Sequence, residues 1–492
     1  MTTRTKALPI LWTLTGCGGF GAEARHVERP SAGQPPYSMA TPMEESRNTE
    51  EYEDHGVNRW TDSGEDRFST FAIDVDTGSY TIVRRKIRED QRVPPEAVRV
   101  EECLNYFRYE DRGPTDQRPF AVHMEAAPSP YGKGKHLLRV AVKAREVPPQ
   151  ARKIAHLVFL VDVSGSMASA DKLGLAQQSL RILVNNLNER DTVALVTYAG
   201  NTRVVLEPTG MAQRGKILAA IDDLDAGGST AMESGLELAY RLAVRNVRRD
   251  VVSRVIVLSD GDANVGNTTH DELLGTIRAQ VDEGVTLSTV GFGMGNYRDH
   301  LMEQLADRGN GNYSYVDTPA EARRIFGEEL GGTLEVVAQD AKIQVEFDPA
   351  AVARYRLVGY ENRDVADEDF RNDEVDAGEI GAGHTVSAMY EIELRSGGPA
   401  AIATVRIRAE PPGGGEALEH EYPFRADRMR REFEEASRDF RFASAVMGFA
   451  EILRQSEHAR GWGMEDVRRV AQAATQEGNE QREEFVALLG KI

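Results

Sequence analysis

The stretch His156-Leu-Val-Phe-Leu-Val-Asp162-Val-Ser164-Gly-Ser166 decides the fold of the central part of this chain. Its first part is a continuous apolar run, which is typical of a strand buried on both faces of a sheet. Polar residues begin at Asp162, so the strand is expected to end there. Gly165 then permits the chain to turn away from the sheet.

Helices and strands are predicted to alternate through a central block at about residues 151–333. Further strands are expected at Thr192–Tyr198, Ser253–Leu258 and Val285–Val290, with helical patterns between them. This alternation predicts an α/β fold with a doubly wound, mostly parallel sheet. In such a sheet, ligands bind beyond the carboxyl ends of the strands.

The regions on either side of the central block are predicted to form a β-rich domain. Strand-like patterns occur before the block, in residues 120–142, and after it, in residues 342–409. Because a doubly wound domain has neighbouring termini, the block can be inserted into one β-sandwich-like domain. The predicted segments are a lipoprotein-type signal (1–17), a disordered tether (18–66), an N-terminal α+β segment (67–150), the central domain (151–333), a β-rich domain (334–426) and a helical C-terminal segment (427–492).

Five oxygen-bearing side chains are expected at one edge of the predicted sheet. Asp162, Ser164 and Ser166 follow the first strand, Thr230 follows a Gly-Gly-Ser turn, and Asp260 follows a later strand. Residues i, i+2 and i+4 of an extended chain can face one way, which brings the first three together. Carboxylates and hydroxyls suit Mg²⁺ or Mn²⁺. Because hydroxyl ligands carry no charge, such an ion would bind an anionic oxygen, which predicts a carboxylate ligand.

Asp-x-Ser-x-Ser with a later Thr and a later Asp resembles the metal-ion-dependent adhesion site of von Willebrand factor A (VWA) domains. The resemblance implies that Ser164, Ser166 and Thr230 touch the metal, whereas Asp162 and Asp260 bind it directly or through water. It implies a module that binds an Asp or Glu side chain of a partner protein and is not an enzyme.

Four further motifs resemble the bacterial YfbK-like group of VWA lipoproteins. They are Phe68-Ser-Thr-Phe-Ala-Ile-Asp74-Val-Asp76-Thr-Gly-Ser-Tyr80, Tyr198-Ala-Gly, Gly291-Phe-Gly293 and Gly359-Tyr360-Glu361-Asn362. In that group one segment precedes the VWA domain and another follows it. The resemblance therefore extends from about Phe68 to the C-terminus.

The N-terminal residues predict export and lipidation. Arg4 and Lys6 precede a short apolar run, Ala7–Leu14, and the following Leu-Thr-Gly-Cys17 resembles the lipobox of bacterial lipoproteins. The run is too short to span a bilayer. Cys17 is thus the predicted lipidation site, and Gly18 resembles the outer-membrane sorting class if the cell has an outer membrane. The alternative is a soluble periplasmic or cytoplasmic protein.

Charge and cysteine content limit the other functions. The 492 residues carry a net charge of −20, which argues against nucleic acid because phosphate binding requires clustered Lys and Arg. Cys17 and Cys103 are too few for a disulfide framework or a cysteine metal cage. Cys103 lies in an apolar pattern that predicts a buried thiol.

Two alternative functions remain open. Some bacterial VWA proteins serve MoxR-type ATPases, and a cytoplasmic mature protein would favour that role. A metallo-hydrolase would use a metal-bound water, but the sequence shows no obvious general base. Asp76-Thr-Gly-Ser79 matches the aspartic-protease tetrapeptide, yet no second copy occurs in a matching lobe. We interpret it as a turn in which Thr77 or Ser79 caps the next helix, with a secondary cation site as the alternative.

Overall fold

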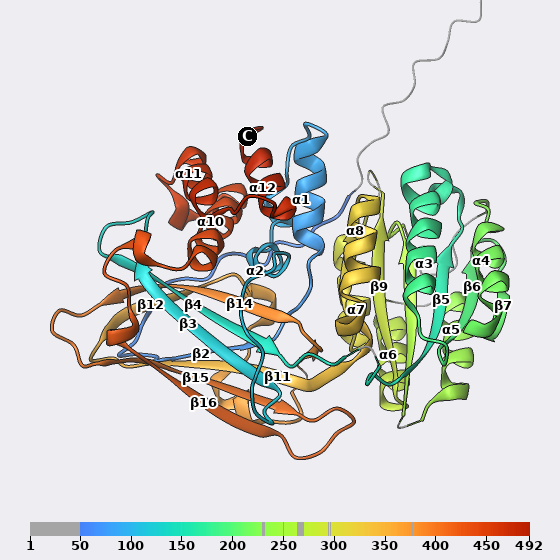
Figure 1. Cartoon of the computed structure of the whole chain (residues 1–492), viewed down its shortest axis with the longest axis horizontal. Helices are drawn as coiled ribbons and strands as arrows, with labels where there is room; N and C mark the ends of the chain where they lie inside the picture. The colour runs from blue at the N-terminus through green and yellow to red at the C-terminus, as the bar shows by residue number, and fades with distance from the viewer. Residues whose placement is uncertain are drawn as a thin grey trace, which may run out of the picture. The chain divides into compact units, whose positions relative to one another are not determined.

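The central domain is a six-stranded sheet in the order β10-β9-β8-β5-β6-β7 (Figure 1). The computed structural model describes residues 50–148, 150–228, 232–248, 250–262, 270–293, 295, 297–375 and 377–492. Neighbouring strands are parallel except β6 and β7, which confirms the predicted doubly wound sheet. The strands are β5 (Ile154–Asp162), β6 (Thr192–Tyr198), β7 (Arg203–Gly210), β8 (Val251–Ser259), β9 (Val285–Phe292) and β10 (Tyr313–Val316).

Helices cover both faces of this sheet because its central strand is apolar on both sides. Leu157, Phe159 and Val161 of β5 point into the core beneath one set of helices. Val158 and Leu160 point into the opposite core. The helices are α3 (Leu175–Asn186), α4 (Arg214–Asp222) and α8 (Pro319–Arg323) on the first face, and α5 (Met232–Ala243), α6 (His270–Asp282) and α7 (Asp299–Arg308) on the second.

The central domain is inserted into a β-sandwich. One sheet has the order β1-β12-β14-β4-β3, so strands from before the insertion pair with strands from after it. The other has the order β13-β11-β15-β16, with β2 beside β11. The first sheet contains β1 (Thr61–Asp62), β3 (Phe120–Pro128), β4 (Lys135–Ala144), β12 (Val352–Val358) and β14 (Thr385–Leu394). The second contains β2 (Phe68–Ala72), β11 (Val336–Phe347), β13 (Gly378–Gly381), β15 (Ala401–Glu410) and β16 (Leu418–Arg425).

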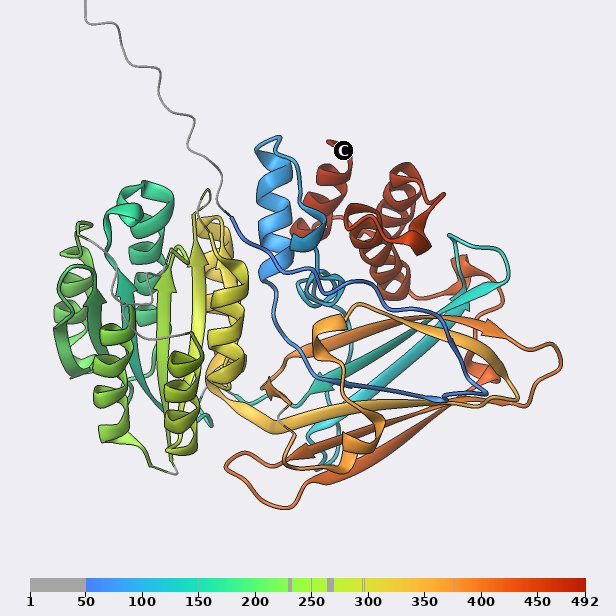
Figure 2. The ribbon, with the colours of Figure 1, turned by 180° about the vertical axis from the view of Figure 1, so that it is seen from behind.

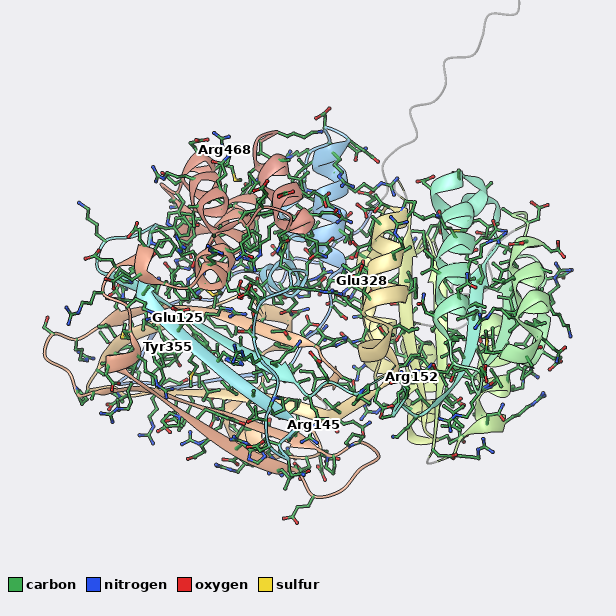
Figure 3. All side chains as sticks on the ribbon, in the orientation of Figure 1. Glu125, Arg145, Arg152, Glu328, Tyr355 and Arg468 are labelled. Atoms are coloured by element: carbon green, nitrogen blue, oxygen red, sulfur yellow. The ribbon has the colours of Figure 1, made fainter. Side chains whose placement is uncertain are left out.

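The two sheets of the sandwich share one apolar core. Tyr355 of β12, labelled in Figure 3, stacks on Phe347 of β11 with ring centroids 4.3 Å apart. This contact joins the sheets face to face. At the start of the inserted domain, Arg152 (labelled in Figure 3) donates from Nη1 to Asp191 Oδ1 at 3.1 Å, in a buried ion pair. That pair joins the residues just before β5 to those just before β6.

The C-terminal segment is helical, as predicted. α10 (Arg438–Leu453), α11 (Met464–Ala474) and α12 (Glu480–Leu489) share an apolar core with α1 (Gly78–Arg88) and α2 (Val100–Asn105). Figure 1 shows these helices above the first sheet of the sandwich. Cys103 of α2 is completely buried in that core, which confirms the predicted buried thiol.

Residues 50–66, which were predicted to belong to the tether, are an ordered strap in the structure. Glu51 N donates to Tyr297 O at 3.1 Å in the central domain, and Ser63 Oγ donates to Val352 O at 2.6 Å in the sandwich. Figure 2 shows this blue segment passing α1 and reaching the sandwich. The prediction of disorder was wrong here because hydrogen bonds to distant segments hold the strap, and these leave no periodic pattern in the sequence. Residues 1–49, including Cys17, lie outside the described residues.

Two helical stretches are interrupted. The first is a 3₁₀ turn, Pro95–Ala97, followed by α2, because Arg99 N donates to Ser79 Oγ at 2.9 Å and not to a backbone carbonyl of the preceding turn. The second consists of α8, then the π-helical turn Arg324–Glu328, then α9 (Leu330–Leu334). Within the part of the chain described, no helix is long and apolar enough to cross a bilayer.

Candidate metal centre

Two buried carboxylates lie at the carboxyl edge of the central sheet. Asp162 is the last residue of β5, and Asp260 directly follows β8, the parallel neighbour of β5. Both residues are fully buried. Burial raises the pKa of Asp162 to about 6, and the charge of Asp260 acts in the same direction. A cation at this edge would therefore stabilise the ionised forms of two neighbouring buried carboxylates.

The loop after β5 brings its two serine hydroxyls together. Ser164 N donates to Asp162 Oδ1 at 2.8 Å, which turns the chain back towards the carboxylate. Ser164 Oγ and Ser166 Oγ lie 2.9 Å apart. Ser259 Oγ donates to the other oxygen of Asp162 at 3.0 Å, so hydrogen bonds from the loop after β5 and from the end of β8 orient this side chain.

The third element of the predicted site is only partly described. Thr230 lies outside the described residues. The glycines before it pack on the serine loop, since Gly165 N donates to Gly228 O at 3.1 Å and Gly227 N donates to Val163 O at 2.7 Å. Gly228 has a φ of +95°, and a Cβ there would lie 2.9 Å from Gly200 N. Only glycine fits this close approach.

One residue at this edge was missed by the sequence reasoning. Lys172 Nζ lies 2.9 Å from Asp260 Oδ2. Its aliphatic stem crosses Gly293, where a Cβ would lie 2.3 Å from Lys172 Cε. This contact explains the second glycine of Gly291-Phe-Gly293. The only sequence signal for Lys172 was that glycine, and the two residues are far apart in the chain.

The donor set fits a small divalent ion. All described candidate ligands are oxygens, which Mg²⁺ and Mn²⁺ prefer. Metal–oxygen distances of about 2.0–2.1 Å place adjacent octahedral ligands about 2.9 Å apart. The hydroxyl oxygens of Ser164 and Ser166 have that separation, 2.9 Å. An ion would share Asp260 with the Lys172 ammonium, so the two cations would compete for one carboxylate.

The Asp74-Val-Asp76-Thr77 motif lies at a different place, between the sandwich and the central domain. Asp76 Oδ1 accepts from Tyr313 N at 2.8 Å, and Arg363 pairs with both aspartates at 3.5 Å. Thr77 occupies the N-cap position of α1, but its side chain makes no capping bond and instead accepts from Arg324 Nη2 at 3.0 Å. The capping interpretation was therefore wrong for Thr77, because tertiary contact with Arg324 takes its hydroxyl.

The comparison with protein families follows these structural divisions. The model described as von Willebrand factor type A domain matches residues 156–328, the inserted domain. A model described as von Willebrand factor matches residues 46–139. The model described as Uncharacterized protein YfbK, C-terminal, matches residues 332–492. The inserted sheet and its polar carboxyl edge thus define a VWA-domain protein.

Among curated relatives, the Uncharacterized protein YfbK of Escherichia coli (strain K12) is 38% identical over 449 residues, which are 86% of this chain and 77% of that protein. The chain belongs to the YfbK family. The Uncharacterized protein sll0103 of Synechocystis sp. is 27% identical over 286 residues, 57% of this chain and 67% of that protein. The solved von Willebrand factor type A protein from Catenulispora acidiphila has a TM-score of 0.47 at 18% identity, covering 78% of this chain and 91% of that one.

Proposed function

We propose that this chain is a divalent-metal-dependent protein-binding module of the bacterial cell envelope. Mg²⁺ or Mn²⁺ would be held by Asp162, Ser164, Ser166, Thr230 and Asp260. The bound ion would supply a Lewis-acidic position for an Asp or Glu carboxylate of a partner protein. One observation carries the proposal. The buried carboxylates of Asp162 and Asp260 lie at the same sheet edge as two serine hydroxyls, whose oxygens are 2.9 Å apart.

The arrangement of the chain's own groups supports binding rather than bond cleavage. Ser164 N and Ser259 Oγ orient Asp162, and Lys172 partly neutralises Asp260. The serine hydroxyls add no negative charge, so an ion there keeps its affinity for an anionic group. VWA domains generally mediate protein–protein interactions, and this chain has such a domain at residues 156–328.

The envelope location rests on the lipobox-like sequence that ends at Cys17. Metabolic labelling with a fatty acid should label the wild-type chain in a bacterial host and leave Cys17→Ser unlabelled. Labelling of both proteins, or of neither, would contradict lipidation at this residue. A mature protein found in the cytoplasm would favour a partner subunit of a MoxR-type ATPase instead.

The metal step is tested first with Mg²⁺ alone. Isothermal titration should give one Mg²⁺ site in the wild type that is lost in Asp162→Ala. Asp250→Ala is the matched control, because Asp250 is an exposed carboxylate at the opposite end of β8. Circular dichroism establishes that all three proteins are folded. Mg²⁺ binding that survives Asp162→Ala would overturn the assigned site.

The partner step uses the same variants. Affinity capture from envelope extracts should recover a partner with wild type and Asp250→Ala in Mg²⁺, and lose it with EDTA or Asp162→Ala. Capture that persists under both conditions would place the interface elsewhere. Turnover of a generic phosphate or peptide ester that depends on Asp260 would instead support a metallo-hydrolase.

A further inference from the structure

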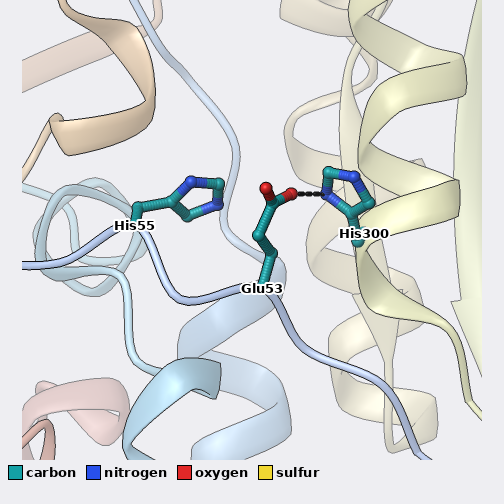
Figure 4. A group of neighbouring side chains, drawn as sticks. All are labelled: Glu53, His55 and His300. Carbon is teal, nitrogen blue, oxygen red and sulfur yellow. Dashed lines mark ion pairs between the residues drawn. The ribbon is translucent and has the colours of Figure 1, made fainter.

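A second group of possible metal ligands lies between the strap and the central domain. Glu53 and His55 come from the strap, and His300 comes from the first turn of α7. One ligand atom from each residue lies within 4.8 Å of the other two. Figure 4 shows the Glu53 carboxylate between the two imidazoles, with Glu53 Oε2 2.6 Å from His300 Nδ1.

The backbone holds these residues together. Glu51 N donates to Tyr297 O at 3.1 Å, and Glu51 forms an isolated parallel bridge with Arg298. The strap thus runs beside the residues that lead into α7. Glu53 and His55 are two positions apart, a spacing that lets both side chains of an extended chain face the same neighbour. His300 projects from the helix start towards them (Figure 4).

The ion pair between Glu53 and His300 leaves the third member of the group, His55, without a role. His55 Nε2 is buried and has no hydrogen-bond partner among the described residues. A buried polar atom without a partner is unfavourable. Burial also lowers the pKa of His55, which favours the neutral imidazole.

Two imidazole nitrogens and one carboxylate oxygen form a ligand set of Zn²⁺ and related ions. The all-oxygen set at Asp162 is chemically different. Ligands of a tetrahedral zinc site lie about 3.3 Å apart, given metal–ligand distances of about 2.0–2.1 Å. Atoms within 4.8 Å reach that spacing by side-chain rotation, and the side chains of Glu53 and His300 are 46% and 36% exposed.

We propose that Glu53, His55 and His300 bind a transition-metal ion of the Zn²⁺ class and so clasp the strap to the VWA domain. A fourth position is open to water, since Glu53 and His55 also line a cavity of about 330 Å³. The proposal does not rest on the proposed Mg²⁺ site.

The clasp lies close to the Asp260 loop. Arg298, two residues before His300, packs against Gly261, where a Cβ would lie 2.7 Å from Arg298 N. A metal ion that holds the start of α7 in place would therefore also restrict the movement of Gly261, the residue after Asp260. Zn²⁺ bound at the clasp should lower the mobility of the strap and of this contact together.

The test uses the full chain without an affinity tag. Zn²⁺ titration calorimetry and Co²⁺ absorption spectroscopy are compared for wild type, His55→Ala, His300→Ala and Glu53→Gln. The matched control is His420→Ala, a partly exposed histidine on β16 of the sandwich. Asp162→Ala separates this site from the Mg²⁺ site, and circular dichroism checks each fold.

Wild type, His420→Ala and Asp162→Ala should bind one Zn²⁺ equally. Loss of an outer-shell partner of a metal ligand costs about 10–100-fold in affinity, so loss of His55 or His300 should cost roughly a hundredfold or more. Hydrogen exchange of residues 50–57 should slow on Zn²⁺ addition in wild type but not in His55→Ala. The clasp would be overturned if wild type did not bind Zn²⁺. It would also be overturned if folded His55→Ala and His300→Ala bound Zn²⁺ as tightly as wild type does.

Discussion

Lys172 Nζ lies 2.9 Å from Asp260 Oδ2, so the chain supplies its own cation to one of the two buried carboxylates at the sheet edge. The Lys172 side chain is 10% exposed and that of Asp260 is 0% exposed. Removing one partner of a buried pair is costly because the other charge stays behind. A divalent ion at this edge has to share or displace the ammonium.

Lys172→Met should make the protein more dependent on Mg²⁺. Without metal, we expect a loss of about 3 kcal/mol in the free energy of unfolding, because Asp260 loses this ammonium. Mg²⁺ affinity should rise by about tenfold, which corresponds to about 1.4 kcal/mol of removed competition. Urea unfolding with and without Mg²⁺, together with calorimetry, measures both effects. Unchanged Mg²⁺ affinity would show that the ammonium and the ion do not compete.

Gly293→Ala should disturb the path of the Lys172 side chain. The added Cβ would lie 2.3 Å from Lys172 Cε at a residue with a φ of +73°. We expect a loss of about 2–3 kcal/mol, of which about 1 kcal/mol is backbone strain. The matched control is Gly295→Ala, where φ is +97° and nothing lies within 4 Å of the added Cβ.

The clash and the strain can be separated by a double-mutant cycle with Lys172→Ala. In that background the shortened side chain leaves space, so Gly293→Ala should cost only as much as Gly295→Ala. An equal cost of Gly293→Ala in both backgrounds would mean that Lys172 is not what requires glycine at this position.

Glu101→Gln should change how stability depends on pH. Burial, and then the charges of Glu361 and Asp74, raise the pKa of Glu101 to about 7 from 4.5. Between these values the folded state binds more protons than the unfolded state, so stability falls as pH rises. The contribution is fully present near pH 4.5 and is lost above about pH 7, a difference of roughly 3 kcal/mol.

The uncharged Glu101→Gln side chain should therefore stabilise the protein at about pH 8 and have little effect at about pH 5. Urea unfolding at both values measures this difference. Glu96→Gln, which removes an exposed carboxylate four residues before the start of α2, is the control and should show the wild-type dependence. A Glu101→Gln protein with the same pH dependence as wild type would contradict the raised pKa.

Arg356→Met should weaken the docking of the C-terminal helices. Arg356 Nη2 donates to Glu391 Oε2 at 2.8 Å and to Glu451 Oε2 at 2.7 Å, and all three side chains are 0% exposed. Removing the arginine leaves two buried carboxylates, so we expect a loss of about 3–5 kcal/mol. Hydrogen exchange should locate the increased opening in α10.

Arg354→Met is the matched control for this prediction. Arg354 lies on the same strand, and its pair with Glu393 is 47% and 28% exposed, so its loss should cost less than about 1 kcal/mol. Similar losses for the two variants would mean that burial does not distinguish the pairs.

The proposed metal ligands show how far local sequence reasoning reaches. Asp162, Ser164 and Ser166 lie within five residues, so strand alternation and one turn were enough to predict that they converge. Lys172 meets Asp260 across 88 residues of sequence, and no pattern near either residue indicates the pairing. The strap was missed for the same reason, because Glu51 is held by Tyr297 through backbone atoms that any residue possesses.

The sequence by itself determined the VWA-like sheet, the inserted arrangement of the sandwich and the helical C-terminal segment. Burial on one or both faces of an element imposes a periodic apolar pattern that can be read locally. Only the tertiary structure decided that Lys172 reaches Asp260, that Arg324 takes the Thr77 hydroxyl, and that Glu53 and His55 meet His300. These contacts join charged or polar groups from distant segments, and the geometry of the whole fold selects each partner.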